Sequence, residues 1–416
     1  MPSAPASRGM DRDGVVILEP ETEGHPQEWL QHLMEFIAGR DVGAPVWLVT
    51  PKALCHSLAK TMPPSVIGRV RLVALSASEQ RLCTHRRLWV SAFARWLTMR
   101  RYLHYTGARS GFFLSLDLLS LPLALGLSAR GKSVSGILFR PSVHYGALGP
   151  YRPSAAEKLR DLRKDILYRL MLRNRTLAMV LSLDPFFPAH AAARYSHGTK
   201  VQALPDPAHP PPTSDDTRPS PPDFKPQGRV GFLLFGHLTE RKGPLALLEA
   251  LALLEPHIGA RIAVLFAGRV DPALRGSLEL RRRMLISQHP EIWLRIEDRR
   301  LDAFELSALI RRSDVVLAPY QRFVGSSGVL LWAAREGRPV LAQDYGLVGR
   351  LTREHRLGLV ADSSSPLSLA VEITRMVEEG PDSFIDKRAA QAYAASHTPH
   401  IFASIILSSV FVPRTA

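Results

Sequence analysis

The chain has 416 residues, more than one compact hydrophobic core normally serves, so the length predicts two domains of about 200 residues each. Hydrophobic residues make up 46% of it and the formal net charge is +15, which favours a globular protein that meets nucleic acid, anionic lipid or a phosphorylated small molecule. The alternative is an arginine bias of the genome. Two cysteines, Cys55 and Cys83, exclude a disulfide framework and favour a reducing, cytoplasmic compartment.

Residues 1–13 contain no apolar core, so they predict a disordered tail and not a signal peptide. The single D-x-D triplet, Asp11 to Asp13, lies in this tail, and we therefore expect no metal in the functional site. No apolar segment of the chain is long enough to cross a bilayer.

In residues 14–204, short apolar runs alternate with helical patterns. This alternation predicts a parallel sheet with helices on both faces, and therefore a Rossmann-like domain. The runs occupy 15–20, 45–50, 70–75, 111–116, 134–139 and 177–183.

Polar residues follow several of these runs, where a doubly wound domain binds its ligands. Gly24 and His25 follow the first run, although His25 is equally a loop residue without a role. Asp117 ends the fourth run as a site residue or a helix N-cap. Arg140 and His144 follow the fifth, and polar groups behind a buried strand must meet something polar.

Two helical segments of this half are rich in charge. Residues 86–105 interleave arginine with large apolar side chains, which predicts either a core helix with solvated arginines or a basic amphipathic helix on an anionic membrane surface. Residues 157–175 mix both signs of charge and predict an exposed helix face.

Residues 205–228 are rich in proline and predict an extended linker. After it, a second alternation over 229–395 predicts a second Rossmann-like domain, and residues 396–416 predict a C-terminal helix that can cross back to the first domain. Together the halves predict an α/β fold with two doubly wound domains facing a cleft. The second set of apolar runs occupies 229–236, 261–268, 292–296, 314–320 and 338–344.

The second domain carries two candidate phosphate-binding loops. In "FGHLTERKGP", Gly236 ends a strand, His237 and Arg241 follow, and Lys242 precedes a helix N-terminus. Such a terminus attracts anions, although an ordinary strand-to-helix turn would have a similar sequence. In "VGSSGVLLWAAREG", the residues 326–328 offer hydroxyls and backbone N–H groups at another helix N-terminus, unless the serines merely cap the helix. Ser326, Ser327 and Gly328 are the candidates there.

The order of "FGHLTERKGPLALLEAL", "SDVVLAPY" and "WAAREGRPVLAQDYG" resembles the nucleotide-sugar domain of retaining GT-B glycosyltransferases of the large family 4 (group 1) type. The resemblance covers about 229–380 and implies the GT-B fold. It further implies metal-independent transfer of a sugar from a nucleoside diphosphate donor to a glycan or lipid-linked acceptor, without a cofactor. Lys242, Arg241 or His237 would then hold the diphosphate, and Arg140 and His144 would act with Lys242 in catalysis.

The sequence also departs from this family. His237 stands where the family has an arginine, and the two glutamates of its E-x7-E motif fall on Val324 and Trp332. A non-catalytic binding or scaffold protein, or a nucleotide-sugar epimerase, therefore stays open. Nucleic-acid binding is not expected, because the chain has no basic, aromatic platform of the known kinds. The base, which we expect near Arg269 and Glu297, and the acceptor are not specified.

Overall fold

The computed structural model describes residues 14–22, 26–40, 43–207 and 223–411. These residues form two compact units. The first contains the described residues up to His144, Ser154–Asp206 and the C-terminal segment from Pro399. The second contains Tyr145–Pro153 and the described residues from Pro207 to Thr398. The predicted tail 1–13, most of the predicted linker, and the candidates Gly24 and His25 lie outside the described residues.

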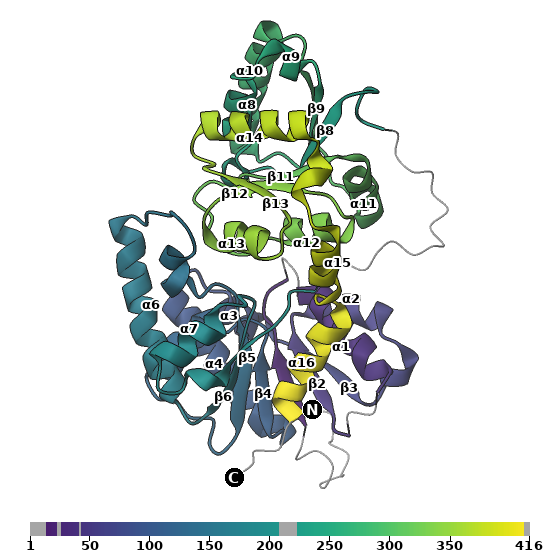
Figure 1. Ribbon diagram of the computed structural model, residues 1–416. Helices are drawn as coiled ribbons and strands as arrows, with labels where there is room; N and C mark the ends of the chain where they lie inside the picture. Colours follow the sequence, from purple (N-terminus) through teal and green to yellow (C-terminus); the bar gives the residue numbers. More distant parts are fainter. Residues whose placement is uncertain (1–13, 23–25, 41–42, 208–222, 412–416) are drawn as a thin grey trace. The chain divides into compact units, whose positions relative to one another are not determined.

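The first unit is built on a seven-stranded sheet in the order β3-β2-β1-β4-β5-β6-β7, with every neighbouring pair parallel. Figure 1 shows it in purple to teal. Its strands are β1 Val15–Leu18, β2 Val46–Thr50, β3 Val70–Ala74, β4 Ser110–Phe113, β5 Ser133–Leu138, β6 Leu177–Ser182 and β7 Val201–Ala203. Its helices are α1 Pro26–Ala38, α2 Lys52–Thr61, η2 Pro64–Val66, α3 Ala77–Cys83, α4 Leu88–Thr106, η3 Asp117–Leu119, α5 Ser120–Ala124, η4 Ser142–Ala147 (whose last residues belong to the second unit), α6 Ala155–Arg173, α7 Phe187–Arg194, η5 Gly198–Lys200 and α16 Pro399–Phe411.

The apolar runs of the first unit are continuous because both faces of the sheet are covered. In β1, Val15 and Ile17 belong to one buried cluster, while Val16 and Leu18 belong to the cluster on the opposite face. The first cluster also contains Phe402 and further apolar side chains of α16. Helix α16, at the C-terminal end of the described residues, therefore completes the core of the unit that contains β1.

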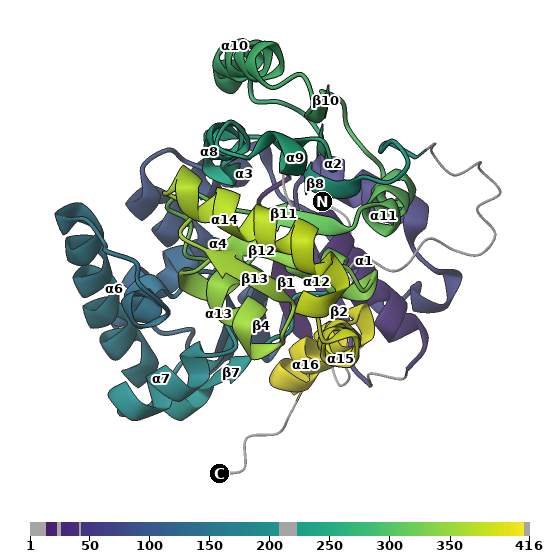
Figure 2. The same ribbon diagram turned by 45° about the horizontal axis from the view of Figure 1, so that its top comes forward.

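The second unit has a six-stranded parallel sheet in the order β10-β9-β8-β11-β12-β13. Figure 2 shows the same unit after a turn of 45° about the horizontal axis. The strands are β8 Val230–Phe235, β9 Ile262–Ala267, β10 Trp293–Glu297, β11 Val315–Ala318, β12 Val340–Gln343 and β13 Gly358–Ala361. The helices are η6 Glu240–Lys242, α8 Pro244–Leu251, α9 Pro256–Gly259, α10 Pro272–Gln288, α11 Ala303–Arg312, α12 Gly328–Arg335, α13 Gly346–Glu354, α14 Pro366–Glu379, η7 Pro381–Phe384 and α15 Lys387–Ala395.

In each unit the chain builds the sheet outward from the centre in both directions. The order reverses between β1 and β4 in the first unit and between β8 and β11 in the second. Two doubly wound parallel-sheet domains were predicted, and this prediction is confirmed. In such sheets the carboxyl ends of the strands at the reversal point form the usual ligand site.

Candidate functional site

Two loops of the second unit lie at its reversal point. One runs from β8 through Gly236 and η6 to α8, and the other runs from β11 through Tyr320 to α12. β8 and β11 pair as parallel neighbours, so the loops that follow their carboxyl ends are neighbours too. Both loops predicted to bind phosphate are therefore brought to one edge of one sheet.

Lys242 joins the two loops. Its Nζ donates a hydrogen bond of 2.6 Å to the carbonyl oxygen of Phe235 and lies 3.5 Å from the hydroxyl of Tyr320. That hydroxyl is 2.6 Å from Oγ of Ser327, the N-cap of α12, which accepts the backbone N–H of Val329. One ammonium, two hydroxyls and one helix N-terminus thus share a site, and the ammonium and helix terminus both attract anions.

Glycine makes the close approach of these loops possible. Gly243 has a φ of 78°, and a Cβ there would lie 2.2 Å from the carbonyl oxygen of Pro319 beyond β11. Gly268, after β9, has a φ of 139°, and its Cβ would lie 2.0 Å from the carbonyl oxygen of Gly236. Any larger residue would push the loops behind β8, β9 and β11 apart.

Tyr320 is the residue that sequence reasoning missed. Its backbone N–H donates to Oε1 of Gln343, and its carbonyl oxygen accepts the hydroxyls of Tyr345 and Ser363. Only 4% of its surface is exposed, so it resembles an ordinary core residue at the end of an apolar run. These bonds to the ends of β12 and β13 fix the direction in which its hydroxyl meets Lys242.

A cavity of about 360 Å³ lies at the ends of β8, β9 and β10. Three arginines line it, Arg269 after β9 and Arg299 and Arg300 after β10. Arg299 is paired with Glu305 at 2.7 Å, while Arg269 and Arg300 are exposed. Gly236, His237, Gly268, Leu301 and Leu306 complete the lining. The cavity therefore offers both apolar walls and positive charge beside the loop that carries Lys242.

The remaining predicted phosphate ligands lie around this site. Arg241 is exposed, with its guanidinium 4.8 Å from the ring centroid of Phe323. Ser326 is half-buried and Gly328 is exposed at the first turn of α12. Gly236 and His237 lie in the wall of the cavity. All of them belong to one unit, and their roles as ligands stay predictions.

Val324 and Trp332 stand where the family resemblance places the two glutamates of the E-x7-E motif, and neither residue carries a carboxylate. The carbonyl oxygen of Val324 accepts the N–H of Leu347 at the start of α13. Trp332 is buried on α12, and the guanidinium of Arg335 lies 4.2 Å from its ring centroid. Neither side chain can accept a hydrogen bond from a hydroxyl group of a ligand.

In the first unit, Asp117 binds backbone and not a helix terminus. Its carboxylate accepts the N–H of Phe139 at 2.9 Å and of Arg140 at 3.4 Å, directly after β5. Burial raises the pKa of this carboxyl above its usual value. The N-cap of η3 is Leu116, so the alternative N-cap role for Asp117 was wrong. Arg140 itself is exposed, and its carbonyl accepts Nζ of Lys164.

His144 already has a polar partner within the first unit. Its Nε2 lies 2.6 Å from Oδ2 of the fully buried Asp184, and its ring stacks on His190 at 5.1 Å. The expectation that this side chain must meet a polar group is satisfied by Asp184. A direct catalytic role for Arg140 and His144 stays a prediction.

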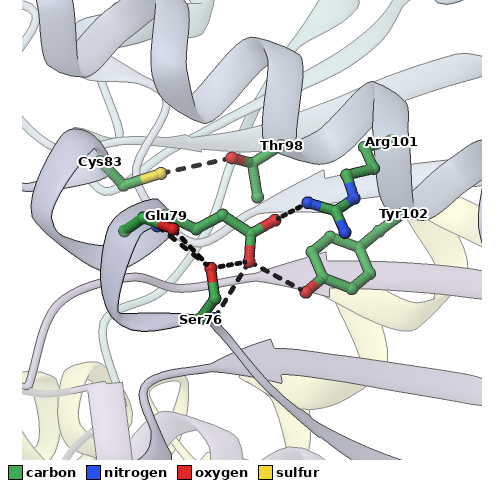
Figure 3. Close-up of polar contacts among 7 residues, drawn as sticks. Ser76, Glu79, Cys83, Thr98, Arg101 and Tyr102 are labelled. Carbon is green, nitrogen blue, oxygen red and sulfur yellow. Dashed lines mark hydrogen bonds and ion pairs between the residues drawn. The ribbon is translucent and has the colours of Figure 1, made fainter. Parts of the chain in front are cut away.

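Most of residues 86–105 belong to α4, one side of which packs into the core, while the large apolar side chains of the other side stay exposed. These exposed side chains are Leu88, Trp89, Leu97 and Tyr105. Arg95, one of its arginines, is buried and donates to the carbonyl oxygen of Cys83. Figure 3 shows that Glu79 of α3 binds Arg101 at 3.0 Å and also Tyr102, while Cys83 contacts Thr98. Arg95 is therefore used inside the unit, whereas Arg86, Arg87 and Arg101 are exposed. Contact of residues 86–105 with an anionic membrane stays a prediction. None of the described helices combines the length and apolarity needed to cross a bilayer.

A comparison with known protein families finds a match within the second unit. Residues 229–379 match the family of glycosyl transferases group 1. We call these matched residues of the second unit the group 1 domain. Lys242, Tyr320, Ser327 and the arginine-lined cavity all fall inside the matched residues.

Solved glycosyltransferases with the GT-B fold share the architecture of both units. HepE from Anabaena, solved in complex with UDP, is 14% identical with a TM-score of 0.61, over 95% of this chain and 98% of that chain. Sucrose-phosphate synthase from Thermosynechococcus elongatus is 16% identical with a TM-score of 0.64, over 95% and 97% of the two chains. A glycosyltransferase from Rickettsia africae is 12% identical with a TM-score of 0.60, over 97% and 100%. No curated protein matches the sequence significantly.

These likenesses establish the GT-B fold around the group 1 domain. The predicted GT-B fold is confirmed, and the predicted likeness to the group 1 type is confirmed over residues 229–379. In the group 1 domain, the described residues include no cluster of three or more histidine, cysteine or acidic side chains arranged to hold a metal. The groups that the structure does bring together at the site are the ammonium of Lys242, the hydroxyls of Tyr320 and Ser327, and the first turn of α12.

Proposed function

We propose that the protein transfers a sugar from a nucleoside diphosphate sugar to an acceptor, and that the group 1 domain binds the donor. The observation that carries this proposal is the bonded set Lys242, Tyr320 and Ser327 at the reversal point of the sheet. An anion that reached this set would meet an ammonium, hydroxyl donors and the N-terminus of α12 together. Diphosphate is the anion that a sugar-nucleotide donor presents.

The same groups suit the departure of the leaving group. Breaking the bond between the sugar and the diphosphate places growing negative charge on a phosphate oxygen. Lys242 would oppose that charge directly, and the helix N-terminus would add roughly 0.3–1 kcal/mol. Because these groups are held in place before the ligand arrives, little reorganisation is needed as the charge develops.

The arginine-lined cavity supports a place for the nucleoside. Its volume of about 360 Å³ lies within the range of small-ligand sites, and its apolar walls would cover a flat base. The cavity shares Gly236 with the loop of Lys242, so a nucleoside there would be continuous with a diphosphate at the set. HepE, of the same fold, was solved with UDP, which favours uridine diphosphate sugars over guanosine ones as the first donors to test.

The finer chemistry is part of the proposal. We infer retention of the anomeric configuration, with the departing phosphate oxygen taking the proton of the acceptor hydroxyl. We also infer transfer of a hexose without a metal, because Lys242 and its neighbours supply positive charge themselves. The acceptor would be a glycan or a lipid-linked glycan handled in the cytoplasm, with Arg140, His144 and Asp117 as first-domain candidates.

A non-catalytic binding protein is the second candidate, and Trp332 is the observation that favours it. The family resemblance places a carboxylate at this position, whereas here a buried indole lies under Arg335. Losing a charged acceptor for two hydroxyls would cost roughly 3 kcal/mol, or about a hundredfold in affinity. The binding of nucleotide alone therefore would not prove transfer.

Calorimetric titration with UDP and GDP tests donor binding. We expect Lys242→Ala to weaken nucleotide binding about tenfold to a hundredfold, as for a hydrogen bond to a charged group. Lys387→Ala is the matched control, because Lys387 is paired with Asp382 on the surface of the same unit. Equal binding by Lys242→Ala and the control would contradict the proposed site, provided both variants melt at the wild-type temperature.

Measurement of turnover distinguishes a glycosyltransferase from a non-catalytic binding protein. A panel of UDP and GDP sugars is incubated with the protein, and release of free nucleotide is measured with and without a chelator of divalent cations. Slow hydrolysis that persists with the chelator is expected for a metal-independent transferase. Nucleotide binding without any release across the panel would favour the binding protein.

A further inference from the structure

α6 of the first unit presents a face of unusual composition. It lies at the outer edge of that unit in both views (Figures 1 and 2). From residue 158 to residue 173, every exposed residue is either a large aliphatic or a cation. The aliphatic members are Leu159, Leu162, Ile166 and Leu170, and the cations are Lys158, Arg160, Arg163, Arg169 and Arg173.

Two of the three acidic residues of α6, Asp161 and Asp165, are turned toward the protein, and the third, Glu157, caps the start of the helix. Asp161 accepts the hydroxyl of Ser142 at 2.6 Å, and Asp165 binds both Arg194 and the hydroxyl of Tyr195. Bonding to Arg194 holds the pKa of the Asp165 carboxyl below its usual value. The sequence predicted mixed charge on an exposed face of this helix. In the structure Asp161 and Asp165 are bonded within the unit, and the exposed charged residues from 158 to 173 are all cations.

The four aliphatic side chains form one row, which we call the α6 stripe. Their spacings of three, four and four residues place them on one side of the helix, over about 16 Å of its length. They are 69%, 57%, 50% and 41% exposed from Leu159 to Leu170. On a helical projection Lys158 and Arg169 stand on one side of the stripe and Arg160 and Arg163 on the other, while Arg173 continues the row at its C-terminal end. Arg160 and Arg169 contact Asp161 and Asp165 through part of their guanidinium groups.

Charge and area decide among the possible occupants. A second copy of the chain would bring five cations against five cations, which is repulsive. A stable complex with a folded protein buries about 800 Å² on each side, well beyond one row of four side chains. A bilayer needs no shaped groove, and it accepts apolar side chains in its interface while flanking arginines and lysines reach the lipid phosphates.

We propose that the α6 stripe and its flanking cations are a docking surface for an anionic lipid membrane. The helix would lie in the plane of the interface, with Leu159, Leu162, Ile166 and Leu170 inserted and the cations at the headgroups. This assigns a membrane contact to a different helix from α4, in which Arg95 is buried and Arg101 is paired with Glu79 at the surface. This proposal does not depend on the donor site, because its test measures binding of the protein to vesicles and not transfer of a sugar.

Flotation with vesicles tests the docking surface. Vesicles of phosphatidylcholine alone are compared with vesicles that also contain phosphatidylglycerol, at low and at high salt. The full chain is expected to float with the anionic vesicles at low salt, and high salt should weaken this binding. Leu162→Glu combined with Ile166→Glu should abolish it, because two carboxylates would then face the lipid phosphates.

The second unit supplies matched controls on α10. Leu280→Glu with Met284→Glu repeats the change at the same spacing, on side chains that are 61% and 53% exposed. Arg163→Ser with Arg173→Ser is expected to weaken binding about twenty-five-fold, from about fivefold for each arginine. Arg281→Ser with Arg283→Ser changes the net charge equally and should retain wild-type binding.

Three results would overturn the proposal. The first is no binding of the full chain to anionic vesicles, which would leave an acidic protein as the partner of the stripe. The second is equal binding by the α6 and α10 variants, which would show that net charge alone drives attachment. The third is a dimer in sedimentation that Leu162→Glu with Ile166→Glu dissociates, which would assign the stripe to self-association.

Discussion

Glu19 is a carboxylic acid buried at the carboxyl end of β1, with 3% of its surface exposed. Its Oε1 accepts the N–H of Glu21 at 2.8 Å, and Arg95 from α4 is bound to the Glu21 carboxylate. Burial raises the pKa of Glu19 from 4.5 to about 7. Near pH 6 the folded protein therefore keeps a proton that the unfolded chain has released.

The sign of the pH dependence follows from this difference. Between about 4.5 and 7 the unfolded state binds fewer protons, so the contribution of Glu19 to the free energy of unfolding falls as the pH rises. Glu19→Gln cannot titrate but still accepts the N–H of Glu21. We expect it to match the wild type below pH 4.5 and to exceed it by roughly 3 kcal/mol above pH 7.

Urea unfolding of wild type and Glu19→Gln at a series of pH values measures this difference. The free energies of unfolding of the two proteins should diverge as the pH rises from about 4.5 to about 7. Parallel stability curves across that interval would show that Glu19 does not change its protonation on unfolding. Glu372→Gln is a suitable control, since Glu372 lies on α14 in the other unit.

Among the elements, the turn between η6 and α8 depends most on one residue. Gly243 combines a φ of 78° with a missing Cβ that would lie 2.2 Å from the carbonyl oxygen of Pro319. Gly243→Ala should destabilise the second unit by more than about 1 kcal/mol, because strain and a clash add. It should also weaken nucleotide binding, because Lys242 would move away from Tyr320.

Gly276→Ala on α10 is the matched control for this prediction. Gly276 lies within a helix, and a Cβ there meets nothing within 4 Å. The change is expected to stabilise the helix by roughly 0.5–1 kcal/mol. Chemical denaturation and calorimetric titration of both variants give the two readouts. A neutral Gly243→Ala variant would mean that the loops after β8 and β11 are not tightly packed.

Strands within apolar runs of five or more residues were predictable, including the half-buried edge strands β3 and β10, whereas two very short edge strands were not. β1 and β8 are buried on both faces, so their sequences are continuously apolar. β7 has three residues, two of them exposed, and the half-buried edge strand β13 begins with glycine; the sequence predicted neither. Periodicity detects burial, so an edge strand with little to bury gives little signal.

Local sequence patterns were limited in the same way for the candidate site. Lys242 and Ser327 were predictable because each stands beside a helix N-terminus within its own loop. Tyr320 was not, because it joins them only through the pairing of β8 with β11, which are far apart in sequence. Arg299 and Arg300 enter the cavity only because β10 lies beside β9. Contacts between distant segments need the sheet order, which local patterns do not contain.

At the scale of the whole molecule, each unit has a core of its own. The buried clusters of the first unit contain residues of β1 to β7 and α16, and that of the second contains residues of β8 to β13. Separate cores favour separate unfolding events, so a calorimetric scan is expected to contain two transitions.

Nucleotide should shift only one of these transitions. A ligand that binds the folded second unit stabilises it by about 2.7 kcal/mol at a hundredfold excess over its Kd, because binding draws the equilibrium toward the folded form. The first unit offers none of the groups in the Lys242 set, so its transition should keep its temperature. Scans with and without UDP, repeated with Lys242→Ala, measure the shift and identify the transition that belongs to the group 1 domain. Movement of both transitions by the same amount would instead mean that the two cores unfold as one cooperative block, because stabilisation of one unit would then be shared by the other.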